Sequence, residues 1–292
     1  MTTPTPRTYR GNCHCGAFVY EVDTPDGKDI TSASECSCSI CYKRAYLWLV
    51  PKTPVRVVKD EGLMVGYGFA GKNLDHQFCG KCGTTVIAKS AMFPAGMGIN
   101  VRTIQGLDIW GLEIKPFNGD TFEPKYVAPT FTGEDPAPAD FEKDGKTYHG
   151  SCHCGAVTTS VRVHGSLEDG TYPDRIMECN CSFCRLGSVW IYPTTSQFAL
   201  TGRDNLTYYT FGNRIWQKLF CKTCGVQVGS EVRPDMSEAE VAALPEAYQQ
   251  HRAKHIDTVP LNLRVLNGFS VKQVEAQRGD GWGLQMPQYV YP

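Results

Sequence analysis

The sequence predicts a mostly β protein made of two tandem copies of one small domain built on antiparallel sheets. Three observations support this prediction. A cysteine pattern occurs twice along the 292 residues. Short segments in which β-branched and aromatic residues alternate with polar ones occur within each copy. Glycine and proline interrupt these segments about every ten residues, which favours small antiparallel sheets over strands that alternate with helices.

The cysteine pattern has three parts: a C-x-C pair, a C-x-C-x-x-C triplet and a C-x-x-C pair. Each half of the chain uses seven cysteines, and the two halves account for all 14. A pattern that leaves no cysteine over predicts two copies of one thiolate-metal module. In chain order the cysteines are Cys13 and Cys15, Cys36, Cys38 and Cys41, Cys79 and Cys82 in the first copy, and Cys152 and Cys154, Cys179, Cys181 and Cys184, Cys221 and Cys224 in the second.

The ends of the repeat set the expected domain boundaries. The first domain takes residues 1–131, and the second takes residues 147–292. The segment 132–146 between them is rich in Pro, Asp and Glu, so we expect an exposed linker. Strands are expected at residues 17–22, 45–50, 54–58 and 99–104 in the first copy, and at residues 157–163, 189–192 and 205–211 in the second.

A helical insertion is expected over about residues 233–256, where the second copy carries about 20 residues that the first lacks. Ser237 and Glu240 have the spacing of a capping box, and alanine and glutamate are frequent around them. Pro245 is expected to end a first helix or to begin a second one. The insertion is either a solvated addition or a flap over a site in the second copy.

Composition and charge limit the classes of function. The formal net charge of −1 gives no electrostatic basis for binding nucleic acid or an anionic membrane. The chain has no apolar run of about 18 residues, so no membrane span is expected. The first residues lack the apolar region of a secretory signal. We therefore expect a cytoplasmic or nuclear protein, in which closely spaced cysteines are more often metal ligands than disulfides. The sequence specifies no oligomeric state.

The seven cysteines of each copy divide into four and three. The triplet places three sulfurs on one tight turn, and the flanking pairs are then left to close a second site together. We expect a structural Zn²⁺ and an open, catalytic Zn²⁺ in each domain, which makes four per chain. The structural sites are Cys13, Cys15, Cys79 and Cys82, and Cys152, Cys154, Cys221 and Cys224; the open sites are Cys36, Cys38 and Cys41, and Cys179, Cys181 and Cys184.

The chemistry of the triplet site has two interpretations. His76, Asp75 or another residue could supply a fourth ligand and close the site as a scaffold. Alternatively, three thiolates leave a zinc complex near net −1, which activates water poorly but holds an incoming thiol as a thiolate, and this favours making or breaking a carbon–sulfur bond. Lys43 and Arg185, shortly after the third cysteines, are either surface charges or anchors for a carboxylate-bearing thiol such as glutathione.

Together, C-H-C-G, C-x-C-S-x-C and F-C-x-x-C-G resemble the glutathione-dependent formaldehyde-activating enzyme family, which also includes centromere protein V. The resemblance covers residues 11–17, 36–41 and 78–83, and residues 150–156, 179–184 and 220–225. It implies an all-β tent fold with a four-cysteine structural zinc and a three-cysteine catalytic zinc. The implied activity is condensation of glutathione with formaldehyde to S-(hydroxymethyl)glutathione, classed as a carbon–sulfur lyase in the reverse sense. The alternative is a non-catalytic, zinc-stabilised binding module, as attributed to centromere-associated relatives.

The two copies differ from each other near the expected open sites. Gly187 matches a family-like glycine after the third cysteine, where the first copy has the residues 43–45. His76 of the first copy corresponds to Lys218 in the second. The two sites therefore cannot be identical, and we favour the second copy as the better thiol-binding site.

Overall fold

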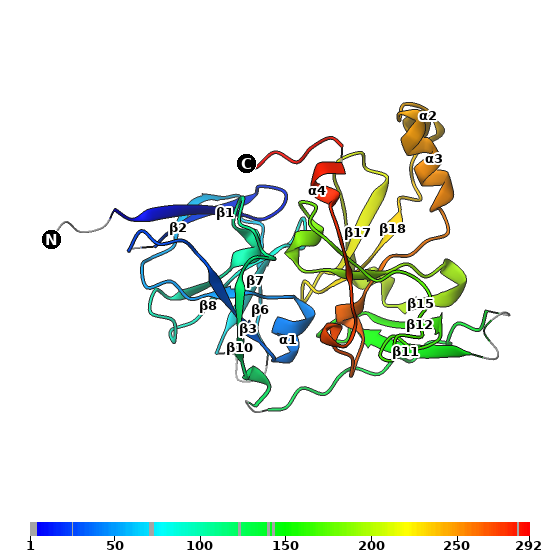
Figure 1. Cartoon of the computed structure of the whole chain (residues 1–292), viewed down its shortest axis with the longest axis horizontal. Helices are drawn as coiled ribbons and strands as arrows, with labels where there is room; N and C mark the ends of the chain where they lie inside the picture. Colours follow the sequence, from blue (N-terminus) through cyan, green and yellow to red (C-terminus); the bar gives the residue numbers. More distant parts are fainter. Residues whose placement is uncertain are drawn as a thin grey trace. The chain divides into compact units, whose positions relative to one another are not determined.

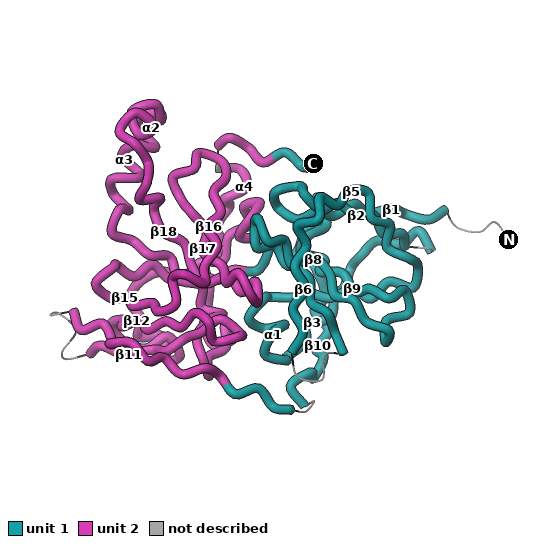
Figure 2. The backbone as a smooth tube through the Cα atoms, turned by 180° about the vertical axis from the view of Figure 1, so that it is seen from behind, with its two compact units in different colours: residues 1–127, 185–187, 290–292 teal, residues 128–184, 188–289 magenta. Residues whose placement is uncertain are grey.

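The computed structural model describes residues 5–24, 26–69, 73–121, 124–138, 141, 144–284 and 286–292. Regular structure in these residues is mostly β, as the sequence predicts, with four short α-helices. The chain forms two compact units, shown in Figure 2. Unit 1 consists of residues 1–127, 185–187 and 290–292, and unit 2 consists of residues 128–184 and 188–289.

Unit 1 contains a small sheet and a large sheet (Figure 1). The small sheet has the antiparallel order β1 (Arg7–Asn12), β2 (Phe18–Thr24), β5 (Arg56–Asp60). The large sheet has the order β10 (Glu113–Phe117), β3 (Ser32–Cys36), β4 (Trp48–Leu49), β9 (Met97–Asn100), β8 (Thr85–Lys89), β7 (Asp75–Cys79), β6 (Met64–Tyr67). Its strand pairs are antiparallel except for β10 with β3, which is parallel. The helices are α1 (Ser39–Lys43), η1 (Val101–Thr103) and η2 (Gly119–Thr121).

Unit 2 repeats this topology. Its small sheet is β11 (Gly145–Ser151), β12 (Thr158–His164), β15 (Phe198–Thr201). Its large sheet is β16 (Leu206–Thr210), β17 (Trp216–Cys221), β18 (Gln227–Val232), β19 (Leu261–Asn262), β14 (Val189–Ile191), β13 (Met177–Cys179), β20 (Gln277–Gly279), and β13 with β20 is again its parallel pair. Short 3₁₀ turns are η4 (Cys184–Leu186), η5 (Thr195–Gln197), η6 (Arg203–Asn205), η7 (Leu263–Val265) and η8 (Val271–Gln273), and α4 (Gly281–Leu284) follows β20.

Two of the expected strands are shorter than the alternation of residues suggests. In the segment 45–50 only β4 is a strand, because Ala45 takes a positive φ of 52° where the chain leaves α1. The segment 99–104 leaves the sheet after Asn100, whose side-chain oxygen accepts a hydrogen bond from the backbone N–H of Arg102 at 3.3 Å. An asparagine that caps the following turn competes with continuation of the strand, and Asn262 does the same in unit 2.

Consecutive residues of the central strands β8 and β18 are buried, so both faces of these strands lie inside their unit. Ile87, Ile99 and Ile104 are fully buried in unit 1. Leu219 and Leu261 are fully buried in unit 2. Burying one such side chain stabilises the fold by about 1.5–3 kcal/mol, so each unit has a hydrophobic core in addition to its cysteines.

The insertion of unit 2 is helical, as expected. It forms α2 (Glu238–Ala242) and α3 (Glu246–Lys254), which project together beyond β18 (Figure 1). The capping box is present: the hydroxyl of Ser237 accepts from the backbone N–H of Glu240 at 3.2 Å, and the Ser237 N–H donates to the Glu240 carboxylate at 2.9 Å. Trp216 Nε1 donates to His251 Nε2 at 3.1 Å, which fastens α3 to β17.

The segment expected to be an exposed linker, residues 132–146, is mostly exposed where the structure describes it, and a few contacts join it and the preceding Phe131 to the rest of unit 2. Phe131 and Phe141 are buried, because their rings lie against His149 and His164, with centroids 5.5 and 3.7 Å apart respectively. Asp135 accepts hydrogen bonds from His149 Nε2 at 2.8 Å and from a serine of β12 at 2.6 Å. Residues 139, 140, 142 and 143 of the segment lie outside the described part.

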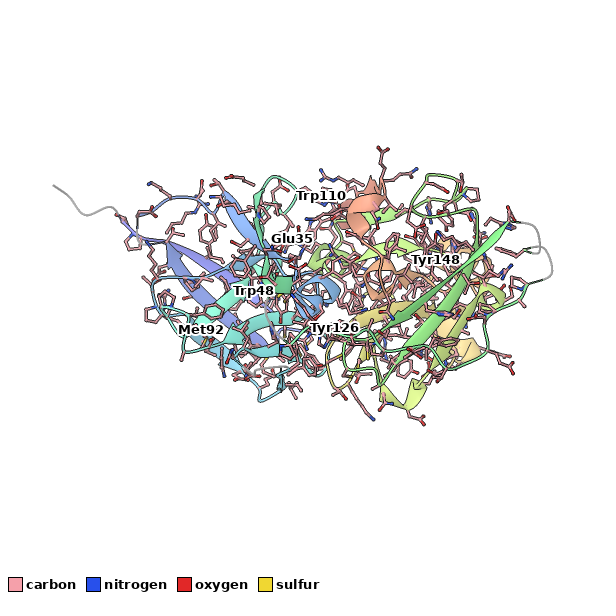
Figure 3. All side chains as sticks on the ribbon, turned by 90° about the horizontal axis from the view of Figure 1, so that it is seen from below. Glu35, Trp48, Met92, Trp110, Tyr126 and Tyr148 are labelled. Carbon is pink, nitrogen blue, oxygen red and sulfur yellow. The ribbon has the colours of Figure 1, made fainter. Side chains whose placement is uncertain are left out.

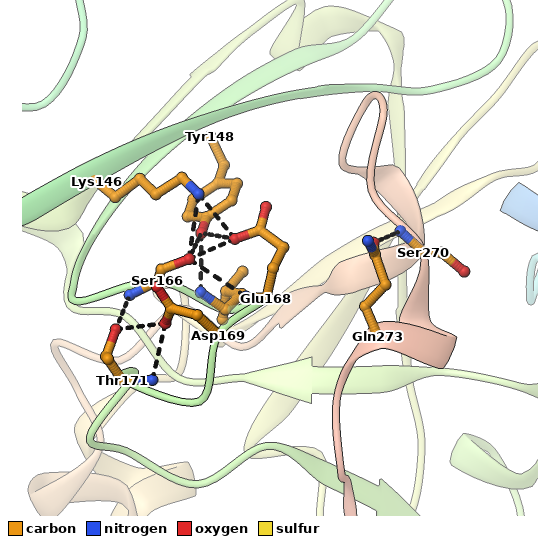
Figure 4. Close-up of polar contacts among 9 residues, drawn as sticks. Lys146, Tyr148, Ser166, Glu168, Asp169, Thr171, Ser270 and Gln273 are labelled. Atoms are coloured by element: carbon orange, nitrogen blue, oxygen red, sulfur yellow. Dashed lines mark hydrogen bonds and ion pairs between the residues drawn. The ribbon is translucent and has the colours of Figure 1, made fainter.

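A polar network joins β11 to the loop after β12 (Figure 4). The Tyr148 hydroxyl donates to Glu168 at 2.6 Å and accepts from the backbone N–H of Leu167 at 2.8 Å. Lys146 donates to the same carboxylate at 2.8 Å. Burial opposes ionisation of Glu168, but the hydrogen bonds from Lys146, Ser166 and Tyr148 outweigh it and lower its pKa to about 2. The network is satisfied internally, which is typical of a structural clamp.

Candidate metal centre

The 14 cysteine sulfurs gather into four clusters, two in each unit. Within a cluster all sulfur atoms lie within 4.8 Å of one another, and none of the cysteines forms a disulfide. Each unit has one cluster of four sulfurs and one of three, with the same members that the spacing of the cysteines suggested. Every cluster could hold a metal ion.

The four-sulfur cluster of unit 1 joins the end of the first strand to a hairpin of the large sheet. Cys13 and Cys15 lie in the turn after β1, whereas Cys79 ends β7 and Cys82 lies in the turn before β8. The Sγ atoms of Cys13 and Cys15 are 3.7 Å apart, and those of Cys15 and Cys79 are 3.6 Å apart. Two sulfurs on a tetrahedral zinc with Zn–S bonds of about 2.3 Å lie about 3.8 Å apart. The cluster therefore has the spacing of a metal tetrahedron.

Unit 2 reproduces this geometry. The Sγ atom of Cys154 is 3.6 Å from those of both Cys152 and Cys221. Backbone amides point at matching sulfurs: Phe18 N donates to Cys13 Sγ at 3.3 Å, and Val157 N donates to Cys152 Sγ at 3.3 Å. Such N–H···S bonds stabilise thiolates, so both turns are built to carry ligand sulfurs.

The three-sulfur cluster of unit 1 occupies one turn of chain. Cys36 ends β3, Cys38 is the N-cap of α1, and Cys41 lies inside that helix. Trp48, labelled in Figure 3, donates its indole N–H to Cys41 Sγ at 3.2 Å. Hydrogen bonds from the thiols of Cys38 and Cys41 lower the pKa of Cys36 to about 3, and its own bond with Cys36 raises the pKa of Cys38 to about 11. The three sulfurs thus hold one negative charge readily, and ionising a second thiol would require a cation beside them.

Neither triplet acquires a fourth protein ligand among the residues that the structure describes. In the part of the chain that the structure describes, no His, Asp or Glu ligand atom joins either group of three within 4.8 Å. His76 instead lies against aromatic rings, with centroids 5.4 Å from Tyr46 and 6.0 Å from Trp48. Asp75 accepts a hydrogen bond from Gln77 at 2.8 Å. A metal held by these sulfurs would keep a position for an outside ligand.

A glycine lies directly against the first sulfur of each triplet, and neither glycine was expected from the sequence. A Cβ atom on Gly119 would be 2.3 Å from Cys36 Sγ, and one on Gly281 would be 2.4 Å from Cys179 Sγ. The parallel strand pairs place them there, because β10 and β20 run beside β3 and β13 up to the first cysteine. The spacing in the sequence could have identified them, because in each copy the glycine stands at the same distance after the capping asparagine, Asn100 or Asn262.

The residue between the first two cysteines of each triplet holds this glycine segment in place. In unit 1, the Ser37 hydroxyl donates to Asp120 at 2.9 Å. In unit 2, Asn180 donates to Asp280 at 2.9 Å and accepts from the backbone N–H of Trp282 at 2.8 Å. In both units, the residue between the first two cysteines of the triplet therefore holds in position the backbone segment that covers the sulfur.

The surroundings of the unit 2 triplet differ from those of unit 1. Phe183, Tyr209 and Phe211 form a stack of rings with centroids 5.5–6.0 Å apart. Lys218 Nζ lies 5.1 Å from the centroid of Trp190 and 5.6 Å from that of Phe183. Hydrogen bonds from the other two thiols lower the pKa of Cys181 well below its ordinary value, and the charge of Lys218 acts in the same direction.

The two cations that the sequence suggested as anchors are placed differently from each other. Lys43 is buried in the last turn of α1. Arg185 groups with unit 1, where its guanidinium donates to the carbonyl oxygens of Ile104 at 3.0 Å and of Leu107 at 2.8 Å. A role of either residue in substrate binding stays a prediction.

Comparison with known proteins identifies similar chains. A family model described as "Glutathione-dependent formaldehyde-activating enzyme" matches residues 8–119 and 147–256. A crystal structure of a Rhodobacter sphaeroides protein shares 27% sequence identity, with a TM-score of 0.33; the match covers 45% of this chain and 99% of that one. Among the described residues, no helix is both long and apolar enough to cross a membrane.

Proposed function

Since the chain belongs to the glutathione-dependent formaldehyde-activating enzyme family, we propose that it is a zinc-dependent enzyme of the carbon–sulfur lyase class. Its substrate is a thiol or thiol adduct that resembles glutathione. The observation that carries the proposal is the pairing, in each unit, of a closed four-sulfur cluster with a three-sulfur cluster that has no fourth protein ligand among the described residues. Closed thiolate sites are typical of structural zinc, and incomplete ones of catalytic zinc.

The residues fit zinc by their chemistry and spacing. Clusters made only of sulfur favour zinc over magnesium or calcium, which prefer oxygen ligands. The Sγ–Sγ separations of 3.6–3.7 Å match a tetrahedral shell. Four clusters imply four zinc ions per chain. Because all 14 thiols must stay reduced to serve as ligands, we infer a reducing compartment such as the cytoplasm.

The reaction forms or breaks one bond to sulfur. In the forward direction the thiol sulfur bonds to the carbon of formaldehyde, and the carbonyl oxygen takes up the proton that the thiol has lost. The reverse direction releases both reactants. Zinc at the three-sulfur cluster would supply one exchangeable position that favours the thiolate form of the substrate.

The protein limits which ligands reach that position. Cys36 and Cys38 are only half-buried in unit 1, and Cys179 is half-buried in unit 2, so a solute can approach these sulfurs. Gly119 and Gly281, which begin η2 and α4 just after β10 and β20, cover the first sulfur of each triplet, so approach is confined to the remaining side.

Metal analysis and thiol titration test the proposal together. Protein purified without added metal should contain about four zinc ions per chain. Glutathione should bind the wild type in a calorimetric titration, and formaldehyde should be consumed in its presence. Cys181→Ser should abolish binding if unit 2 is the working site, with Cys38→Ser as the matched control in unit 1.

The other outcomes separate the alternatives. Loss of binding only in Cys38→Ser would move the active site to unit 1. A wild type that binds no thiol at millimolar concentration would refute the enzyme and favour a zinc-stabilised binding module. A zinc content near two, with the remaining thiols reactive in the native protein, would refute the division into closed and open sites.

A further inference from the structure

Equivalent strands of the two units carry different side chains beside the triplet clusters. Lys218 lies on β17, three positions before Cys221, and His76 lies on β7, three positions before Cys79. Their cross-strand partners correspond as well, since Tyr209 faces Lys218 and Tyr67 faces His76. The two units therefore carry an ammonium and an imidazole at the same position of the fold.

Aromatic rings hold the ammonium of Lys218 in position. Its Nζ lies within 5.1–5.6 Å of the ring centroids of Trp190 and Phe183, within the range of a cation–π interaction. Phe183 stands between Cys181 and Cys184 in the sequence, so the ammonium lies over a ring that belongs to the turn of the triplet itself. The side chain is therefore a fixed cation within electrostatic reach of the three sulfurs.

In the described part of unit 1, the cation near this place is Arg44, whose guanidinium lies 5.4 Å from the ring centroid of Tyr67 and 5.0 Å from that of Phe78. His76 is buried among Tyr46, Trp48 and Phe69, with ring centroids 5.4–6.0 Å away. The nearby Arg44 is also buried, and it is engaged by the Tyr46 hydroxyl at 3.2 Å. An imidazole packed among rings does not offer the exposed donors with which an ammonium binds a carboxylate.

The balance of charge at the two triplet clusters gives them different preferences for charged and uncharged thiols. Three thiolates and one divalent ion sum to −1, and an incoming thiolate would add a second negative charge. A further carboxylate on the ligand would increase the repulsion unless a cation compensates it. Lys218 provides that compensation in unit 2.

We propose that Lys218 is the specificity-determining residue of unit 2, where it binds a carboxylate of the thiol substrate. It thereby selects carboxylate-bearing thiols over uncharged ones. Unit 1, with His76 at the same place, does not discriminate between them. The inference rests on the proposed function, because it assumes that a thiol binds at the triplet cluster.

Two thiols that differ in charge test this assignment. Glutathione carries carboxylates, and 2-mercaptoethanol carries none. Each is titrated calorimetrically into wild type and Lys218→Met, a variant that keeps the length and the apolar stem of the side chain. Glutathione should bind Lys218→Met about ten- to a hundredfold more weakly, the range expected for a lost hydrogen bond between charged groups. The affinity for 2-mercaptoethanol should change by less than about twofold.

Control variants and a second readout exclude a structural explanation. Lys218→Arg should keep the preference for glutathione, and His76→Gln should not alter the glutathione affinity of unit 2. Zinc content and the thiolate-to-metal absorption of cobalt-substituted protein should be the same in Lys218→Met and wild type. Equal weakening of both thiols, or no change for either, would overturn the role of Lys218. A wild type that binds neither thiol would refute the proposed function, and this inference with it.

Discussion

The glycine that covers the triplet sulfur provides a sharp test of the metal assignment. In Gly281→Ala the new Cβ atom would lie 2.4 Å from Cys179 Sγ and 2.9 Å from Cys181 Cβ. The backbone of Gly281 is not in the left-handed region, so alanine is conformationally acceptable there. Only the contact with the cysteines opposes the substitution.

The size of the displacement can be worked out from these distances. Ordinary contact begins near 3.4 Å, so Cys179 Sγ and the new methyl group must separate by about 1 Å. Metal–ligand distances tolerate only about 0.2 Å. The backbone cannot absorb the shift easily, because β20 pairs with β13 up to Gly279 opposite Cys179. We therefore expect the zinc affinity of this cluster to fall by at least about 10–100-fold.

Metal content after dialysis against a chelator is the assay. The wild type should retain one zinc ion at each of the four clusters. Gly281→Ala should retain about three, because it loses the ion of the unit 2 triplet. Gly119→Ala should lose the ion of the unit 1 triplet instead. Gly170→Ala is the control, because a Cβ there meets nothing within 4 Å; its positive φ of 78° costs about 1–2 kcal/mol of stability without touching a cluster. Full zinc retention by Gly281→Ala would show that Cys179 is not a metal ligand.

Two further predictions concern single hydrogen bonds. Trp48→Phe removes the N–H donor to Cys41 Sγ and should weaken zinc retention in unit 1 about tenfold. The indole N–H of Trp190 has no hydrogen-bond partner among the described residues, so Trp190→Phe should leave zinc retention in unit 2 unchanged. Equal losses of zinc in the two variants would contradict the reasoning. Burial lowers the pKa of His251 below 6.5, so the folded state binds fewer protons than the unfolded chain, and acidification below pH 6.5 should weaken the bond from Trp216. Hydrogen exchange of α3 at pH 7 and pH 5.5 measures this, and His251→Gln should reduce the pH dependence to the part that comes from His255, whose pKa burial also lowers.

The grouping of the cysteines could be predicted because it depends on short-range geometry. Three sulfurs within one turn, as at Cys36–Cys41, can meet around one ion whatever the rest of the fold does. The pairs that flank them had no other partners left, since each copy contains seven cysteines. The sequence favoured an open triplet but left His76 as an alternative fourth ligand, because the position of His76 depends on the rings of Tyr46 and Trp48 around it.

The cover over the triplet could not be predicted for a different reason. It depends on a parallel pairing between β3 and β10, which are far apart in the chain. Alternation of residues identifies a strand but specifies neither its partner nor its direction. Asn100 and Asn262 were visible in the sequence as parts of a repeated phrase, yet their role in ending the strand required the observed turns η1 and η7.

The two units are alike where metal sites would hold the fold and different where a ligand would bind. Both four-sulfur clusters have sulfur separations of 3.6–3.7 Å and an amide donating to the first sulfur at 3.3 Å. Beside the triplets, by contrast, His76 stands where unit 2 has Lys218, and the indole bond of Trp48 to Cys41 Sγ is not formed by Trp190. A structural zinc contributes about 10–16 kcal/mol to folding, so changes at its ligands would cost each unit its stability. Changes around the open cluster carry no such cost, so under the proposed function the two copies can differ in the thiols that they bind while the scaffold stays the same.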